Sequence, residues 1–159
     1  MNNIEMIKVT NKNREEVNKF LMDNWYSTDI VIRGKIVDGT KVDGFIVFDN
    51  NRIIGLITYI IYDDVCEMVT LNSLEENKGV GTALCNKLKE VALENKCRLI
   101  RLITTNDNLN ALGFYQRRGY VLTRLFSNAM EDVRKIKNIP FIGENNIPLR
   151  DELELELKI

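Results

Sequence analysis

A short polar segment with two glycines runs directly into an amphipathic stretch in the middle of the chain. It reads Glu-Asn-Lys-Gly-Val-Gly from Glu76 to Gly81, and residues 80–95 repeat apolar side chains at helical spacing. Glycines in this position let backbone N–H groups close around a phosphate at a helix N-terminus, where the helix dipole also favours negative charge. The residues expected to bind the phosphate are Lys78, Gly79, Val80, Gly81 and Thr82.

Two other phosphate-binding motifs do not fit these glycines. The third glycine of the dinucleotide-binding pattern would fall on Leu84, and the chain has no Gly-Lys-[Ser/Thr] of a P-loop. A glycine turn that only starts a helix is the alternative. Glu76 adds a carboxylate, which is unfavourable beside a phosphate unless it points to solvent, whereas Lys78 supplies positive charge.

Composition limits the class of protein. The length of 159 residues predicts one domain over residues 1–159, and a hydrophobic content of 45% is enough for an ordinary core. A net charge of -1 gives no field that would attract nucleic acid or an acidic membrane. The N-terminus lacks the basic and apolar blocks of a signal peptide, and no apolar run is long enough to span a membrane. We therefore expect a cytoplasmic protein without nucleic-acid or membrane partners.

The chain has no histidine and three cysteines, Cys66, Cys85 and Cys97. The missing histidine excludes Ser–His and Cys–His nucleophile pairs and any His-ligated metal site. The cysteines are odd in number and have no CxxC spacing, so we expect reduced thiols and no metal. Proton transfer must then depend on Glu, Asp, Tyr, Lys, Cys or water.

The hydrophobic pattern predicts an α/β fold with a mixed, mostly antiparallel sheet and flanking helices. Asn13 is the expected N-cap of the first helix, Asn50-Asn51 marks a hairpin, and residues 25–43 are expected to be irregular. Residues 151–159 alternate acids with leucines, which indicates an exterior strand with one buried face. Strands are expected over 4–10, 44–49, 52–62, 65–72, 98–104, 120–126 and 151–159, and helices over 15–23, 80–95 and 108–117.

A second motif follows the glycine loop, with Asn108 and Ala111 followed by Phe114-Tyr115 and then Gly119-Tyr120. Together the two segments resemble the signature of the GCN5-related N-acetyltransferases, which transfer an acetyl group from acetyl-coenzyme A to an amine. The resemblance implies the acyl-CoA N-acyltransferase fold. In that fold two central strands, here 65–72 and 98–104, splay apart and leave a cleft for the pantetheine arm. It also implies acetyl-CoA as cosubstrate and no metal.

The resemblance assigns roles to two residues of the second motif. The hydroxyl of Tyr115 is expected near the thioester sulfur, where it protonates the leaving thiolate, and the side chain of Asn108 is expected to hold the pantetheine arm. The alternative for Tyr115 is a core aromatic side chain.

Glu67 is the candidate general base, acting directly or through water. Alternation along 65–72 places Glu67, Val69 and Leu71 on one side of the strand. The backbone groups of Val69 and Leu71 are expected to bind the acetyl carbonyl and the arm. The alternative for Glu67 is a solvent-facing residue at the rim.

These residues predict an acetyl-CoA-dependent N-acetyltransferase that works by direct transfer. The acceptor is a small-molecule amine or an amine of a peptide or protein, contacted from residues 25–39 and 127–148. The alternative is a module that binds coenzyme A or acyl-CoA without turnover. A homodimer is compatible with either function.

Overall fold

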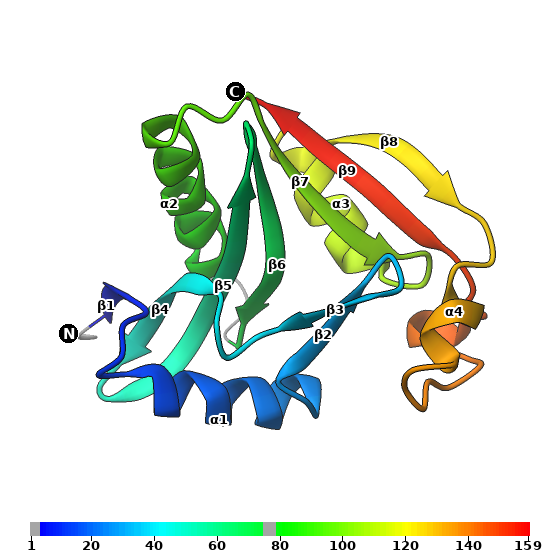
Figure 1. Cartoon of the computed structure of the whole chain (residues 1–159), viewed down its shortest axis with the longest axis horizontal. Coiled ribbons are helices and arrows are strands. Elements are labelled where there is room, and N and C mark those ends of the chain that lie inside the picture. Colours follow the sequence, from blue (N-terminus) through cyan, green and yellow to red (C-terminus); the bar gives the residue numbers. More distant parts are fainter. Residues whose placement is uncertain (1–3, 75–78) are drawn as a thin grey trace.

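The computed structural model describes residues 4–74 and 79–159. Nine strands, four α-helices and one short 3-10 helix make up this part of the chain (Figure 1). In chain order they are β1 (Ile4–Lys8), α1 (Arg14–Trp25), β2 (Asp29–Ile32), β3 (Lys35–Asp38), β4 (Asp43–Asp49), β5 (Arg52–Tyr62), β6 (Val65–Ser73), α2 (Val80–Glu94), β7 (Leu99–Thr105), α3 (Leu109–Arg117), β8 (Val121–Phe126), α4 (Met130–Arg134), η1 (Glu144–Asn146) and β9 (Glu152–Lys158).

Seven strands form one mixed sheet in the order β1-β4-β5-β6-β7-β9-β8, and β2 and β3 form a separate hairpin. Within the described residues β6 and β7 are the one parallel pair, and the other neighbours run antiparallel. The parallel pair is joined by the crossover helix α2, as parallel neighbours require. The predicted fold class, a mixed and mostly antiparallel sheet with flanking helices, is confirmed.

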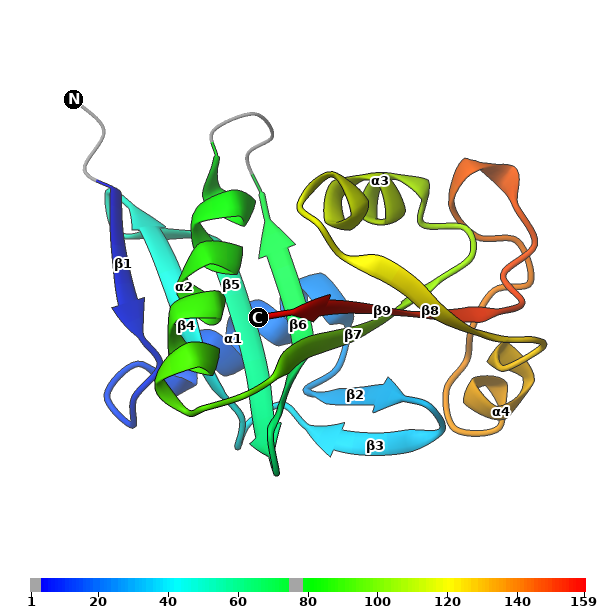
Figure 2. The ribbon, with the colours of Figure 1, turned by 90° about the horizontal axis from the view of Figure 1, so that it is seen from above.

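The parallel pair separates soon after it begins. Val65, Cys66 and Glu67 pair with Leu99, Ile100 and Arg101, and the register ends there. Beyond that point the two strands diverge, as both ribbon views show (Figures 1 and 2). The predicted splay of these two strands is therefore confirmed, and it opens the middle of the sheet.

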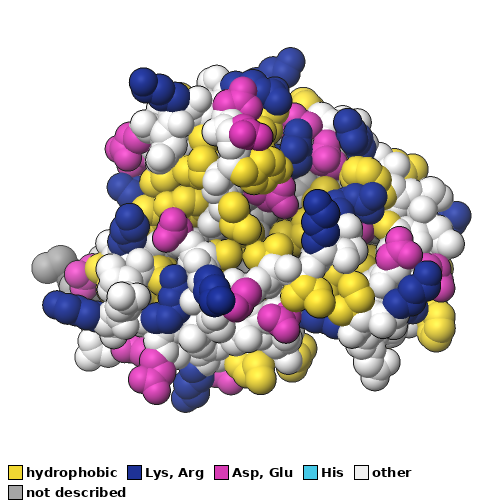
Figure 3. All heavy atoms as spheres, in the orientation of Figure 1, with side chains coloured by type: hydrophobic (Ala, Val, Ile, Leu, Met, Phe, Trp, Pro, Cys, Tyr) yellow, Lys and Arg dark blue, Asp and Glu magenta, His cyan; other side chains and the backbone are white. Residues whose placement is uncertain are grey.

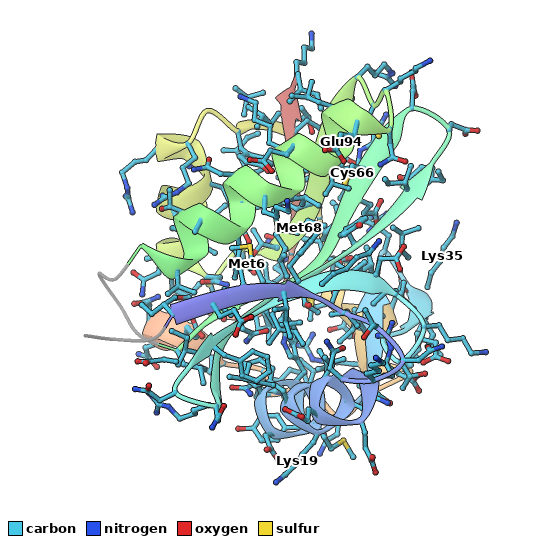
Figure 4. All side chains as sticks on the ribbon, turned by 90° about the vertical axis from the view of Figure 1, so that its left-hand side faces the viewer. Met6, Lys19, Lys35, Cys66, Met68 and Glu94 are labelled. Atoms are coloured by element: carbon cyan, nitrogen blue, oxygen red, sulfur yellow. The ribbon has the colours of Figure 1, made fainter. Side chains whose placement is uncertain are left out.

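Helices cover both faces of the sheet. The apolar stripe of α2, which includes Leu84, Leu88 and Val91, packs on β5 and β6, and Figure 4 shows Cys66 and Met68 of β6 beneath this helix. On the other face α1 buries Val17, Phe20 and Leu21 against β4 and β5. The helical spacing of these side chains is what fixes the buried face of each helix. No helix in the described ranges is long and apolar enough to cross a membrane.

The segment expected to be irregular contains the β2–β3 hairpin, so that prediction was wrong. Arg33 and Gly34 turn the chain with φ of 51° and 73°, values that favour a tight two-residue turn. Ile30 and Ile32 face the sheet and pack with Val69 of β6. The alternation is short and interrupted by charges, so the pattern alone did not identify these strands. Seen from above, the hairpin lies on one side of the splay, whereas α3 and the start of α2 lie on the other (Figure 2).

Two further expectations need correction. The strand β9 is not exterior, because it lies between β7 and β8 and buries Glu152 and Glu154. Arginines from other elements satisfy these acids, and no local pattern reveals such partners. Asn13 does stand at the start of α1, but its side chain does not cap the helix. It accepts a hydrogen bond from the Thr10 amide and donates one to the Lys8 carbonyl instead.

Candidate active site

A cleft of about 720 Å³ lies between the end of β6, the start of α2 and the helix α3. Two of these elements, α3 and the start of α2, lie on the side of the splay away from the β2–β3 hairpin (Figure 2). The structure thus brings together most of the residues singled out from the sequence. Those that line the cleft are Leu71, Gly79, Val80, Gly81, Thr82, Asn108 and Tyr115.

Glycine is required at the entrance to α2. Gly79 is the N-cap residue and has a φ of 73°, a left-handed conformation that L side chains rarely adopt. A Cβ at Gly81 would lie 3.2 Å from the Phe114 ring, so the first turn of α2 approaches α3 closely. The N–H groups of this first turn have no partner within the helix, so they are available as donors for an anion. Glu76 and Lys78, which were expected to affect the phosphate, lie outside the described residues.

Arg118 is a cation of this cleft that sequence reasoning missed. Its guanidinium lies 3.4 Å from the centroid of the Phe114 ring and donates a hydrogen bond to the Phe114 carbonyl at 2.8 Å. Nε and Nη2 of Arg118 also donate to the hydroxyl of Thr82, at 3.1 and 2.5 Å. Positive charge is therefore fixed beside the first turn of α2. The available signal was the Arg117-Arg118 pair just after the α3 motif.

Tyr115 extends from α3 toward the splayed strands. Its hydroxyl donates a hydrogen bond to the sulfur of Met68 on β6, at 3.5 Å, and the residue is 8% exposed. The rings of Phe114 and Tyr120 pack against it edge-on, with centroids 5.4 and 5.5 Å away. Burial, with a smaller contribution from Cys85, raises the pKa of the Tyr115 phenol well above its usual value. Tyr115 thus keeps its proton and lines the cleft with a neutral donor.

Asn108 stands at the N-terminus of α3 and caps it. The Oδ1 atom accepts a hydrogen bond from the Ala111 amide at 3.2 Å, which satisfies one of the free N–H groups of the first helical turn. The side-chain amide group has no hydrogen-bond partner within residues 4–74 and 79–159. It therefore remains a donor at the wall of the cleft.

A bulge in β6 changes the predicted orientation of its side chains. Thr58 and Tyr59 of β5 face Thr70 and Met68, so Val69 has no opposite residue in the register. Val69 packs with the hairpin cluster, whereas Leu71 packs on the α2 side. The expectation that Leu71 shares a side with Glu67 and Val69 was therefore wrong, because a bulge shifts the alternation by one residue.

Glu67 is held on the face that carries the hairpin. It is the register partner of Ile60, which packs with the hairpin cluster, and of Arg101 on β7. The Tyr62 hydroxyl donates a hydrogen bond to its Oε2 at 2.7 Å. Burial and this contact raise the pKa of the Tyr62 phenol. Met68, the partner of Tyr115, is the next residue along β6 and packs on the opposite side, under α2.

A second groove, of about 900 Å³, lies between the later turns of α2 and β3. Hydrophobic side chains gather there, ringed by charged ones, in the space-filling view (Figure 3). Its wall includes Ile60 and Ile61, which extend past the start of β4 because Asp43 pairs with Tyr59. The groove therefore reaches the strand that lies beside Glu67 and Cys66.

The cysteines do not suit nucleophilic or metal chemistry. All three are buried and free. Burial raises the pKa of the Cys66 thiol to about 12 and that of Cys85 to about 11, so both stay protonated near neutral pH. In the part of the chain that the structure describes, no group of three metal-ligating side chains comes together.

Comparison with known families shows to which family the chain is related. The model of the acetyltransferase (GNAT) family matches residues 11–120. The chain belongs to this family. The Bacillus subtilis (strain 168) protein YxbD is 49% identical over 144 residues, which cover 89% of this chain and 91% of that protein.

Solved structures agree on the fold. A GNAT family acetyltransferase from Elizabethkingia anophelis with acetyl-CoA bound superimposes with a TM-score of 0.71 at 20% identity, covering 99% of both chains. A Bacillus subtilis acetyltransferase in complex with CoA gives a TM-score of 0.68 at 19% identity, covering 100% of this chain and 99% of that one. Both likenesses extend over the whole of the described sheet and its helices.

Proposed function

We propose that the protein transfers an acetyl group from acetyl-CoA to an amine by direct attack, without a covalent enzyme intermediate. The observation that carries this proposal is the opening between β6 and β7. It begins just after the Glu67–Arg101 pair and has Tyr115 on one side and Glu67 on the other. Structures of the same fold bind acetyl-CoA or CoA, which supports the cosubstrate.

The phosphate end of the cosubstrate belongs at the first turn of α2. Gly79 to Thr82 offer backbone N–H groups there, and Arg118 adds a fixed positive charge. The free amide group of Asn108 and the backbone of Leu71 line the path toward the splay. The residues present therefore fit an anionic ligand with a long neutral arm.

The bound thioester supplies the activated acetyl group, and the chain supplies the proton donor and the oxyanion site. Tyr115 holds its proton at neutral pH because it is buried, so its hydroxyl can protonate a departing thiolate. Val69 has no opposite residue in the β5 register, and its backbone N–H is our candidate donor to a developing oxyanion. No metal is needed for either step.

The amine approaches from the hairpin side. Glu67 faces that side, and its carboxylate accepts the proton of the attacking amine directly or through water. The β2–β3 hairpin and the groove of about 900 Å³ beside β5 provide contacts for the rest of the acceptor. The thiolate then leaves on one face of the sheet at β6, and the amine enters on the other face.

A thermal-shift experiment tests the cosubstrate site. Coenzyme A at 100 times its Kd stabilises a folded protein by about 2.7 kcal/mol, so the melting temperature should rise. Gly81→Glu should abolish this shift, because the added side chain brings bulk and negative charge into the phosphate site. Ala83→Glu adds the same charge at an exposed position on the same helix and should keep the shift. A normal shift with Gly81→Glu would place the phosphates elsewhere.

A product screen tests the reaction. Acetyl-CoA is incubated with free lysine, a dipeptide with a free α-amino group and a small alkyl diamine, and acetylated product is detected by mass spectrometry. Acetylation of any of these amines supports the transferase. Binding of coenzyme A without product from a wide amine panel would favour the non-catalytic module instead.

A further inference from the structure

A chain of polar contacts runs across the hairpin face of the sheet at the point where β6 and β7 begin to separate. The Tyr62 hydroxyl donates to Oε2 of Glu67 at 2.7 Å, and Arg101 Nη1 donates to the same hydroxyl at 3.2 Å. Arg101 is the register partner of Glu67, in the last pair that joins the two strands. The contacts thus meet at the apex of the opening.

Arg101 forms ion pairs with acids other than Glu67. Its Nη2 lies 3.4 Å from Oε1 of Glu156, and its Nε lies 3.6 Å from Oε2 of Glu154. Glu154 is 6% exposed and also accepts a hydrogen bond from the Thr123 hydroxyl at 2.8 Å. A buried carboxylate with several partners is rigid, so it fixes Arg101 from the side of β9.

Glu67 differs from these two acids in its ion pairs and hydrogen bonds. Within residues 4–74 and 79–159 it makes no ion pair, and its one side-chain hydrogen bond comes from the neutral phenol of Tyr62. The phenol stands between the guanidinium of Arg101 and the carboxylate. Glu67 therefore has one fixed oxygen, Oε2, and one oxygen, Oε1, without a hydrogen-bond partner in the same ranges.

We infer that Tyr62 is a positioning residue for Glu67, and that Arg101 holds Tyr62 in place. The hydrogen bond fixes the carboxylate so that Oε1 faces the acceptor amine. The phenol also keeps Arg101 from pairing directly with the base. This inference rests on the proposed role of Glu67. It adds a reason why the carboxylate is supported by a tyrosine instead of by the adjacent arginine.

A double-mutant cycle tests the inference in turnover. Tyr62→Phe removes the hydroxyl and keeps the ring, and Glu67→Gln removes the base. With acetyl-CoA and the amine of the panel that is acetylated fastest, Tyr62→Phe should lower kcat roughly tenfold, since misplacing a catalytic group can cost up to about 10²-fold. The KM for acetyl-CoA should stay unchanged. In the Glu67→Gln background the same substitution should cause no further loss.

Tyr120→Phe is the matched control, because it also removes a phenol hydroxyl, and that hydroxyl has no hydrogen-bond partner in the described ranges. It should leave kcat unchanged. Equal losses from Tyr62→Phe in both backgrounds, or no loss in either, would overturn the inference while the base assignment stands. An unchanged kcat with Glu67→Gln would overturn the base, and the inference with it.

A titration tests the contact without any acceptor. The ionisation of Tyr62 is followed by ultraviolet absorbance, as the difference between the unmodified protein and Tyr62→Phe. The hydrogen bond and the charge of Glu67 both oppose ionisation of this phenol, whereas Arg101 favours it. Glu67→Gln should therefore let Tyr62 ionise at a lower pH. An unchanged titration would show that the two side chains do not interact in solution, and would overturn the inference.

Discussion

The guanidinium of Arg118, just after α3, donates two hydrogen bonds to the hydroxyl of Thr82 in the first turn of α2. The contact joins the two segments that carry the family signature. It also places a positive charge where the helix dipole already favours an anion. The site therefore has a cation, Arg118, even though the residue at position 76 is an acid. This holds whether or not Lys78 contributes.

The first prediction follows from this contact. Arg118→Met should weaken coenzyme A binding by about tenfold, near 1.4 kcal/mol, because a charge-assisted contact to phosphate is lost. Pantetheine, which has no phosphates, should bind equally well to both proteins. Calorimetry or the fluorescence of Trp25, the single tryptophan, gives the affinities. Trp25 donates a hydrogen bond to Asn72 of the cleft wall, at 2.6 Å, so its emission should report occupancy.

Arg98→Met is the control for this prediction, since Arg98 makes an exposed ion pair with Asp64 away from the cleft. It should leave both affinities unchanged. An equal loss of coenzyme A and pantetheine affinity with Arg118→Met would mean that Arg118 supports α3 and does not bind phosphate.

Local patterns in the sequence predicted the elements that frame the site. The helix expected over residues 80–95 is found as Val80–Glu94, and the hairpin turn at Asn50 and Asn51 has the positive φ values of 49° and 70°. The splay between the strands expected at 65–72 and 98–104 is also present. The helix and the turn depend on side-chain period or turn chemistry within a few residues, so the sequence carries them directly, whereas the splay was expected from the family resemblance.

The features that sequence reasoning missed depend on distant partners. The bulge at Val69 is a register shift against β5, and the strand itself contains no sign of it. The contact of Tyr62 with Glu67 requires the β5–β6 pairing, and the burial of Glu152 requires Arg33 from the hairpin. Such contacts form only when the sheet has assembled.

The second prediction concerns Tyr115. Tyr115→Phe should lower kcat by about 10²-fold, near 2.7 kcal/mol, because the thiolate would leave without its proton donor. The affinity for coenzyme A should change little. Steady-state kinetics, with chemistry shown to be rate-limiting, provide the measurement.

Tyr120→Phe is matched to Tyr115→Phe. Tyr120 packs against Tyr115 with ring centroids 5.5 Å apart, and its hydroxyl has no hydrogen-bond partner in the described ranges. It should therefore keep a normal kcat. If the two variants behave alike, Tyr115 is a core aromatic residue and another group protonates the thiolate.

The third prediction concerns stability in alkali. Burial raises the pKa of Tyr59 and of Cys66, each to about 12, from the ordinary values of 10.0 and 9.0. The folded state thus favours the neutral forms. Their contribution to stability is complete below pH 9 for the thiol and below pH 10 for the phenol. It is lost as the pH rises through about 12, because the unfolded chain releases these protons first.

Urea unfolding at pH 8, 9.5 and 10.5, with a reductant present, measures this loss. The free energy of unfolding should fall with pH, at up to about 1.4 kcal/mol per pH unit for each group that is ionised only in the unfolded state. Tyr59→Phe should flatten the slope between pH 9.5 and 10.5. A free energy that is constant up to pH 10.5 would contradict the burial of these groups.

The fourth prediction concerns Glu67 and the acceptor. Freeing a lysine-like amine of pKa about 10.4 costs about 4.6 kcal/mol at pH 7, whereas an α-amino group of pKa near 8 costs only about 1.4 kcal/mol. A base is therefore more useful to the first kind of acceptor. Glu67→Gln should lower kcat/KM more at pH 7 than at pH 9, where alkali deprotonates the amine without help. The difference should be larger for the more basic acceptor.

Profiles of kcat/KM against pH for one acceptor of each kind separate the roles open to Glu67. A loss that is the same at both pH values would indicate that the carboxylate positions the amine, because positioning does not depend on the protonation of the free acceptor. No loss at either pH would make Glu67 a rim residue. The proton would then pass to ordered water, since the nearby Glu154 and Glu156 already pair with Arg101.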